Sequence, residues 1–262
     1  MRLLSYNIHK GIGGTDGRYR LERIAEVIEY DNPDIVLLQE VTCKYGRCGT
    51  DDQPKLLAER LHAVDLLYQQ NVHYKVGCYG NLVLSKFPIV ERHQVSLRLN
   101  SKKPRGAQIA VVETPEGPLK VVNVHLGLAE NERRWQIDHL LGHNLFRKID
   151  GIPELLAGDY NDWRNRLAPG AFDRDHFHHI TAPPSKFRSF PAFLPLGSLD
   201  KAFCRGKLTV TEARISRHAS SRVASDHLPL VVDFHLGQPK PGAPIALYDG
   251  HNRPERNGSA KH

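Results

Sequence analysis

Polar side chains at the ends of four apolar runs are the part of this sequence that could do chemistry. A carboxylate at the end of a buried strand must be solvated, paired or bound to a cation, since burying it alone is costly. Each such residue also has a structural alternative, as a helix cap or an ion-pair partner. The structural interpretation is less favoured here because polar residues stand beside an apolar run at four places in one chain. The positions are Asn7, Glu40, Asp159 with Asn161, and Asp226 with His227.

The types of donor atom indicate a hard divalent cation. Carboxylate and amide oxygens are the ligands preferred by Mg²⁺ and Mn²⁺, whereas zinc sites usually recruit cysteine or clustered histidine. Magnesium keeps several waters and binds one or two protein carboxylates, which leaves positions for a phosphate oxygen. The residues therefore favour hydrolysis of a phosphate ester assisted by Mg²⁺, with Mn²⁺ as a substitute.

Strands that end at these polar positions would bring them to one edge of a sheet, where active sites often lie. Helical spacing of apolar residues predicts helices that include residues 21–28 and 131–148. Helix and strand alternate without internal repeats. Apolar runs and turn signals predict strands over residues 2–8, 34–40, 81–84, 90–97, 107–113, 119–125, 154–158, 208–216 and 228–236.

The composition is that of a globular protein, with 40% hydrophobic and 25% charged residues among 262. We predict one catalytic domain over residues 1–236 and a flexible tail over 237–262, where the periodicity is lost. No apolar stretch approaches a membrane span, so we expect a cytoplasmic monomer with no transmembrane segment. Four cysteines at irregular spacing are expected to be reduced thiols. The formal charge of +7 favours an anionic partner without specifying which anion.

Six short motifs, in this order, resemble those of the endonuclease/exonuclease/phosphatase superfamily. Each motif alone is weak, but six in the family's order are specific. The resemblance implies an α/β (α+β) fold, a four-layer sandwich of two packed mixed β-sheets flanked by helices. The motifs are Ser5–Ile8, Leu38–Val41, Asn123–Leu126, Gly158–Asn161, Leu199–Asp200 and Ser225–Pro229.

The resemblance also implies roles for the residues around the metal. Glu40 would be the principal ligand, and Asn7 and Asp226 would complete or support the shell of the cation. Asp159 would orient or deprotonate the attacking water, and Asn161 would hold a phosphate oxygen or the nucleophile. These positions match the motifs of the family one by one.

The resemblance assigns two histidines to the phosphate. His227 would contact it through one ring nitrogen while Asp200 fixes the other. His125 matches a histidine of deoxyribonuclease-I-like and neutral-sphingomyelinase-like members, and would stabilise the transition state or protonate the leaving oxygen. The number of ions, one or two, stays open because Asp159, Asn161 and His227 could form a second site.

Other residues have weaker signals. Arg105 could bind a phosphate oxygen or be a plain surface charge, and Asn81 could contact substrate or cap a turn. The histidines of residues 176–179 lack zinc spacing, so we interpret them as a mobile loop rather than a metal site. The aromatic stretch of residues 187–194 could touch a base or lipid, although packing under the rim of the site is the simpler interpretation.

These observations lead to competing functional hypotheses. The first is a divalent-metal-dependent phosphodiester hydrolase using in-line attack of water, with a nuclease favoured by the basic charge. The second is a hydrolase of phospholipids or of other small phosphodiesters or phosphomonoesters, and the third is a non-catalytic anion-binding protein. His125 stands where the apurinic/apyrimidinic endonuclease branch usually has tyrosine, which argues against an abasic-site pocket. The fold and site do not select the substrate.

Overall fold

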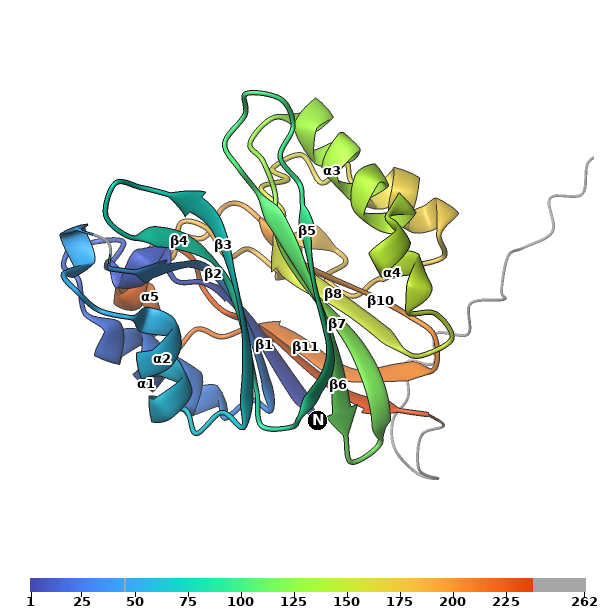
Figure 1. Ribbon diagram of the computed structural model, residues 1–262, viewed down its shortest axis with the longest axis horizontal. Helices are drawn as coiled ribbons and strands as arrows, with labels where there is room; N and C mark the ends of the chain where they lie inside the picture. Colours follow the sequence, from blue (N-terminus) through green and yellow to red (C-terminus); the bar gives the residue numbers. More distant parts are fainter. Residues whose placement is uncertain (45, 238–262) are drawn as a thin grey trace, which may run out of the picture.

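Two six-stranded β-sheets stack face to face, and helices cover both outer faces (Figure 1). The structure, a computed structural model, describes residues 1–44 and 46–237. In chain order the strands are β1 (Arg2–Asn7), β2 (Ile35–Cys43), β3 (Asp65–His73), β4 (Cys78–Ser85), β5 (Ile89–Ser96), β6 (Gly106–Thr114), β7 (Gly117–His125), β8 (Glu154–Asp159), β9 (His178–His179), β10 (Asp200–Arg205), β11 (Leu208–Ile215) and β12 (Leu230–Leu236).

The first sheet has the order β11-β12-β1-β2-β4-β3, and the second has the order β5-β6-β7-β8-β10-β9. Both sheets are mixed, because β1 pairs in parallel with β2 and β7 pairs in parallel with β8, among antiparallel neighbours. This arrangement confirms the predicted four-layer sandwich of two mixed sheets flanked by helices.

The helices divide between the two outer faces. In Figure 1, α1, α2 and α5 lie on the outside of the first sheet, and α3 and α4 on the outside of the second. Their bounds are α1 (Leu21–Asp31), α2 (Gln53–Arg60), α3 (Glu130–Gly142), α4 (Asn144–Lys148) and α5 (Ser221–Ala224), with short helical turns at His9–Gly11, Gly46–Cys48, Ala168–Phe172 and Pro184–Lys186.

Alternation along the central strands explains why their sequence is continuously apolar. Leu3 and Leu37 belong to the core between the two sheets, whereas Leu4 and Val36 belong to the core under α1. A strand buried on both faces has no polar side, so its apolar run is unbroken. A third core joins the second sheet to α3.

Three strand pairings align the ends that carry polar residues. Parallel pairing of β1 with β2 places Asn7 opposite Gln39, the neighbour of Glu40. Parallel pairing of β7 with β8 places His125 opposite Asp159, and antiparallel pairing of β10 with β8 places Asp200 opposite the same residue. Residues far apart in the sequence therefore meet at one edge of the two sheets.

The predicted list of helices and strands was wrong at one helix and incomplete elsewhere. The single helix predicted over 131–148 is two helices, because His143 has an extended backbone and its Nδ1 accepts a hydrogen bond from Leu145 N–H, capping α4. The predictions omitted α2, β3 and β10. The strand β3 is an edge strand with a largely polar, half-exposed sequence, so its apolar signal is weak.

The histidine-rich segment is not the mobile loop that the sequence suggested. His178 and His179 form β9, which pairs with β10. The His179 ring stacks on Phe203 with centroids 4.6 Å apart, and burial lowers its pKa to about 4. The His179 ring therefore packs in the interior. The absence of zinc spacing in the sequence excluded a metal site but did not predict this packing.

Three other predictions concern the whole chain. The four cysteines form no disulfide. Within residues 1–44 and 46–237, no helix has the length and apolar character needed to cross a bilayer. The predicted tail, apart from Gly237, lies outside the described residues.

Candidate active site

Asp159, the last residue of β8, lies at the centre of the polar cluster. The amide of Asn7 donates to its Oδ2 at 3.0 Å, and the backbone N–H of Asn161 donates to its Oδ1 at 2.9 Å. Nε2 of His125 and Nε2 of His227 lie 3.5 and 3.7 Å from Oδ2. Burial raises the pKa of Asp159 to about 6, although the charge of His227 opposes this shift.

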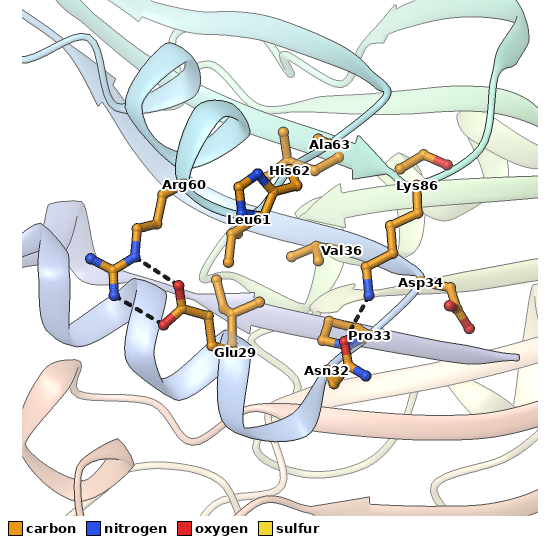
Figure 2. A pocket seen from close by; sticks show the side chains of 13 residues that line it. Glu29, Asn32, Pro33, Asp34, Val36, Arg60, Leu61, His62, Ala63 and Lys86 are labelled. Carbon is orange, nitrogen blue, oxygen red and sulfur yellow. Dashed lines mark hydrogen bonds and ion pairs between the residues drawn. The ribbon is translucent and has the colours of Figure 1, made fainter.

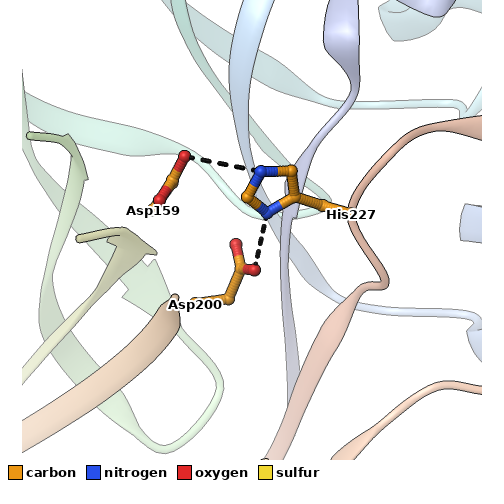
Figure 3. Close-up of side chains that lie close together, drawn as sticks. All are labelled: Asp159, Asp200 and His227. Atoms are coloured by element: carbon orange, nitrogen blue, oxygen red, sulfur yellow. Dashed lines mark hydrogen bonds and ion pairs between the residues drawn. The ribbon is translucent and has the colours of Figure 1, made fainter. Parts of the chain in front are cut away.

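His227 and Asp200 form a hydrogen-bonded pair beside Asp159 (Figure 3). Nδ1 of His227 lies 2.8 Å from Oδ2 of Asp200, which also accepts a hydrogen bond from Ser189 Oγ at 2.5 Å. Burial alone would lower the pKa of His227, but the carboxylates of Asp200 and Asp159 outweigh it and raise the pKa to about 10. His227 is therefore an imidazolium at neutral pH, and its Nε2–H points toward Asp159 (Figure 3).

His125 has the opposite protonation state. Nη1 of Arg105 lies 3.2 Å from Nδ1 of His125. Burial and the charges of Arg105 and His227 hold the pKa of His125 well below its usual range, so the ring is neutral. A guanidinium can only donate, so Nδ1 accepts and the ring proton lies on Nε2, facing Asp159.

Glu40 lies in a bulge of β2, between the registers of Leu38 and Val41 with β4. Its φ of 57° turns the side chain out of the normal alternation of the strand. The carboxylate forms an ion pair with Lys10, which lies on the turn after β1. Burial alone would raise the pKa of Glu40, but the Lys10 ammonium outweighs it and holds the pKa below its usual range.

Asp226 lies at the solvent side of the cluster. Its side chain is 31% exposed, and its Oδ1 is 4.0 Å from Nδ1 of His9. The preceding Ser225 donates from Oγ to the carbonyl oxygen of Asn7 at 2.7 Å. This bond fixes the loop that carries Asp226 and His227 to the end of β1.

The amides of Asn161 and Asn81 have structural partners. Nδ2 of Asn161 donates to the carbonyl oxygen of Leu126 at 3.0 Å, which ties the loop after β8 to the end of β7. Asn81 is buried on β4, and its Nδ2 donates to the carbonyl oxygen of Gly106 on β6 at 3.0 Å. Asn81 therefore joins the two sheets and does not cap a turn, which corrects that alternative.

Side chains from both sheets thus form one hydrogen-bonded or charge-paired cluster around a single carboxylate. Among the described residues, one group of acidic and histidine side chains has ligand atoms close enough to hold a metal ion, all within 4.8 Å of one another: Asp159, Asp200 and His227. Glu40 and Asp226 are paired instead with Lys10 and His9.

A family model described as the Endonuclease/Exonuclease/phosphatase family matches residues 4–227, a span that includes every residue of this cluster. The chain belongs to this family. Its members are phosphoric ester hydrolases, as the resemblance of the six motifs implied.

The chain is also similar to known proteins and to solved structures. The chain is 30% identical over 252 residues to an uncharacterised protein, YbhP, of Escherichia coli, covering 90% of this chain and 96% of that protein. It is 33% identical over 137 residues to a 5'-tyrosyl-DNA phosphodiesterase of Caenorhabditis briggsae, covering 51% of this chain and 35% of that protein. The crystal structure of an endonuclease/exonuclease/phosphatase from Beutenbergia cavernae superimposes with a TM-score of 0.78 and 26% identity, covering 94% and 73% of the two chains.

Sequence patterns indicated no role for several residues that bond to or adjoin the side chains of this cluster. Lys10 and Ser189 are common residue types in loops, and nothing in their spacing marks them. Gln39 and Asn123 belong to two of the six motifs, which imply no role for them. Nε2 of Gln39 donates to Oδ1 of Asn123 at 2.8 Å, and the Asn123 amide donates to Gln108 Oε1 at 2.9 Å. This buried polar chain connects the two sheets.

The aromatic stretch of residues 187–194 divides between packing and exposure. Phe187 is buried, and the Phe190 ring lies 4.8 Å from the His227 ring, centroid to centroid. Phe193 and Leu194 are 60% and 57% exposed. Packing beneath the rim of the site therefore accounts for Phe187 and Phe190. It does not account for Phe193 and Leu194.

A separate hollow of about 210 Å³ lies near the start of β2, between α1 and α2 (Figure 2). Polar side chains of its lining bond to each other: Arg60 pairs with Glu29 at 2.7 Å, and Lys86 donates to the amide oxygen of Asn32 at 2.7 Å. None of the polar residues around Asp159 lines this hollow.

Proposed function

We propose that this family hydrolase cleaves phosphodiesters with the help of a divalent metal, Mg²⁺ or Mn²⁺. One observation carries the proposal: Asp159 lies between two histidines in opposite protonation states, neutral His125 and protonated His227. Such an arrangement supplies a base and two N–H donors around one point, as hydrolysis of a phosphate ester requires.

Asp159 would hold and deprotonate the attacking water. Its pKa of about 6 leaves it ionised at neutral pH while keeping it basic enough to accept a proton. The bonds from Asn7 and Asn161 fix its two oxygens, so the carboxylate does not have to reorient. Positioning of the nucleophile contributes much of the rate acceleration in phosphoryl transfer.

His227 and His125 would stabilise the charge that develops on the phosphate. Asp200 holds the His227 imidazolium in place and keeps it charged, so that its Nε2–H can donate to a phosphate oxygen. His125 presents a neutral Nε2–H, with Arg105 behind it. That group can stabilise the transition state or donate to the leaving oxygen, and the guanidinium adds positive charge.

The metal would be held by Glu40, with Asn7 and Asp226 completing or supporting its shell. The structure fits such an ion, because Glu40 already stabilises a positive charge, that of Lys10, and the donors are oxygen atoms. When bound, the cation would neutralise charge on the phosphate oxygens. Ligand atoms of Asp159, Asp200 and His227 lie close enough for a second ion, but such an ion would require His227 to lose its proton.

Nucleic acid is one substrate class to test, because the net charge is +7 and a relative is named a 5'-tyrosyl-DNA phosphodiesterase. A monomeric state and a cytoplasmic location remain predictions. Each can be measured, by light scattering and by fractionation.

A substrate panel tests the proposal. Plasmid DNA, RNA, phospholipid vesicles, a phosphomonoester and bis-p-nitrophenyl phosphate are incubated with Mg²⁺, Mn²⁺ or EDTA. We expect metal-dependent cleavage of at least one diester, and a loss of roughly 10²–10⁴-fold in Asp159→Asn, the range expected for removal of a general base. The matched control is Asp150→Asn, whose carboxylate is 80% exposed. Cleavage that persists in EDTA, or that Asp159→Asn leaves intact, would overturn the proposal.

The dependence on salt distinguishes the substrate classes. Cleavage of nucleic acid should fall steeply with added salt, because released counterions oppose each phosphate contact. Cleavage of a small diester should change little. Binding of anions without turnover of any ester would support a non-catalytic protein instead.

A further inference from the structure

A polar groove of about 420 Å³ lies beside the candidate active site, between the edge strands β3 and β5. Gln69 and Arg105 are only 5% and 7% exposed and form its floor. The groove is lined by Gln69, Gln70, Asn71, Val72, His73, Gln94, Ser96, Arg98, Pro104 and Arg105.

The lining has an unusual composition. Four side-chain amides face the groove together with two arginines, and none of its lining residues is Asp, Glu, Phe, Tyr or Trp. Amides both donate and accept hydrogen bonds, and arginine binds anionic oxygens. Binding sites for unpaired bases typically provide an aromatic platform for stacking, and sites for acyl chains provide an apolar wall. The lining therefore fits a group that carries hydroxyls and a negative charge.

Two atoms of the floor support this interpretation. Among the described residues, neither Oε1 of Gln69 nor Nε of Arg105 has a hydrogen-bond partner. Buried polar atoms normally have partners, so two unpaired atoms in one floor favour a ligand that would pair with them. Oε1 can accept a hydrogen bond and Nε can donate one, and a hydroxyl group can both donate and accept.

Gly106 gives the floor its shape. A Cβ at this position would lie 2.3 Å from Oδ1 of Asn71 and 2.5 Å from Nε2 of Gln69. The absence of a side chain therefore lets both amides approach the backbone of β6.

Arg105 connects the groove to the catalytic cluster. The same guanidinium that lines the groove lies 3.2 Å from His125, whose other ring nitrogen is 3.5 Å from Asp159. We infer that the groove binds the part of the substrate that does not react, and that this part is a phosphorylated polyol or sugar. This inference rests on the proposed function and specifies its substrate class.

Two chromogenic diesters with the same p-nitrophenolate leaving group test the inference. One carries an ethyl group as its second ester, and the other carries a glyceryl group with a free hydroxyl and a terminal phosphate. We expect kcat/KM to be at least about tenfold higher for the phosphoglyceryl ester, since a hydrogen bond to a charged group contributes that much. Arg98→Ala should lower the ratio of the two kcat/KM values by about tenfold, because it removes one cation of the groove.

Arg92→Ala is the matched control. Arg92 lies on β5 with its guanidinium on Asp65, outside the groove, and its loss should not change the ratio. A second variant, Gly106→Ala, should lower the ratio through the amides of Gln69 and Asn71. Near-ultraviolet circular dichroism verifies that each variant is folded. Equal turnover of both esters by the unmodified protein would overturn the inference while leaving the proposed function intact.

Failure of the proposed function gives a different result. If neither ester is turned over with any metal, calorimetric titration of the unmodified protein and of Arg98→Ala with glycerol 3-phosphate tests binding at the groove directly. Binding that weakens about tenfold in the variant would support the groove as a binding site. Absence of binding would overturn the inference.

A free phosphorylated polyol and a lipid headgroup present the same chemistry. Vesicles of phosphatidylcholine, with and without phosphatidylglycerol, distinguish these two sources. Cleavage of the vesicle lipid that depends on Arg98 would assign the groove to a headgroup. Cleavage of the soluble ester alone would assign it to a free compound.

Discussion

The ion pair between Lys10 and Glu40 joins two residues that both have left-handed backbones, with φ of 64° and 57°. Such a conformation costs a non-glycine residue on the order of 1–3 kcal/mol and persists only where the surroundings hold it in place. Here a turn after β1 and a bulge in β2 bring one cation to one carboxylate. The ammonium therefore neutralises the carboxylate that we propose as the principal metal ligand.

Replacing Lys10 should strengthen metal binding. In Lys10→Met, a cation no longer competes with the ammonium for Glu40, so we expect the Mn²⁺ affinity to rise about tenfold, equivalent to about 1.4 kcal/mol. Isothermal titration calorimetry measures the affinity directly. Lys55→Met is the control, because Lys55 is 71% exposed and pairs with Glu59 at 3.9 Å on the surface. Weaker Mn²⁺ binding in Lys10→Met would show that Lys10 supports the ion.

Replacing Glu40 should have the opposite effect. Glu40→Gln keeps the shape of the side chain and removes its charge, so Mn²⁺ affinity should fall by at least about tenfold. The concentration of Mg²⁺ needed for half-maximal activity should rise accordingly. Glu59→Gln is a control on the exposed surface, since its carboxylate is 62% exposed. An unchanged Mg²⁺ requirement would remove Glu40 from the metal site.

The pH profile should be bell-shaped. Asp159 must be ionised to accept a proton, so kcat/KM should rise as the pH passes about 6. His227 must be protonated to donate, so kcat/KM should fall as the pH passes about 10. Because Asp200 raises the pKa of His227, the basic limb of Asp200→Asn should move to lower pH. A basic limb that Asp200→Asn leaves in place would contradict this role of the pair.

His227 and Asp200 should behave as one unit in a double-mutant cycle. His227→Ala and Asp200→Ala should each lower kcat/KM, and the double variant should lose less than the sum by roughly 0.5–3 kcal/mol. The 2.8 Å contact between Nδ1 and Oδ2 is the reason, since either change removes it. Additive losses would indicate that the two side chains act independently.

A buried ion pair at the other end of β8 should control stability rather than activity. Nζ of Lys120 lies 2.9 Å from Oε1 of Glu154, and both side chains are at most 1% exposed. Glu154→Ala leaves the ammonium without its carboxylate, which should cost about 3–5 kcal/mol of unfolding free energy. Urea denaturation measures this cost. Glu130→Ala, which breaks the exposed pair with Arg134, should cost about 1 kcal/mol or less.

The sequence predicted the ends of β1 and β8 to within one residue because burial on both faces leaves a continuous apolar run, but β2 continues past Glu40 through a bulge to Cys43. Leu3 and Leu4 face different cores, so the run before Asn7 is continuous, as it is before Glu40. Ordered motifs predicted which strand ends would meet. The contacts of Asn7, His125 and His227 with Asp159 agree with that prediction.

Other features depend on contacts that no local pattern encodes. Lys10 pairs with Glu40 because a turn and a bulge adopt matching left-handed conformations. The edge strand β3 owes its place to pairing with β4, and its Gln69 and Gln70 resemble loop residues. The break at His143 reflects a side-chain cap that competes with helix continuation.

The pairing of β1 with β12 has a consequence for synthesis of the chain. Leu4 is opposite Val231, so the first strand acquires this neighbour only when nearly the whole described chain has left the ribosome. The loop that carries His227 immediately precedes β12, and Ser225 anchors it to Asn7. Nascent chains halted before this strand would therefore lack the anchored loop, and the proposed site would be complete only after translation has passed β12.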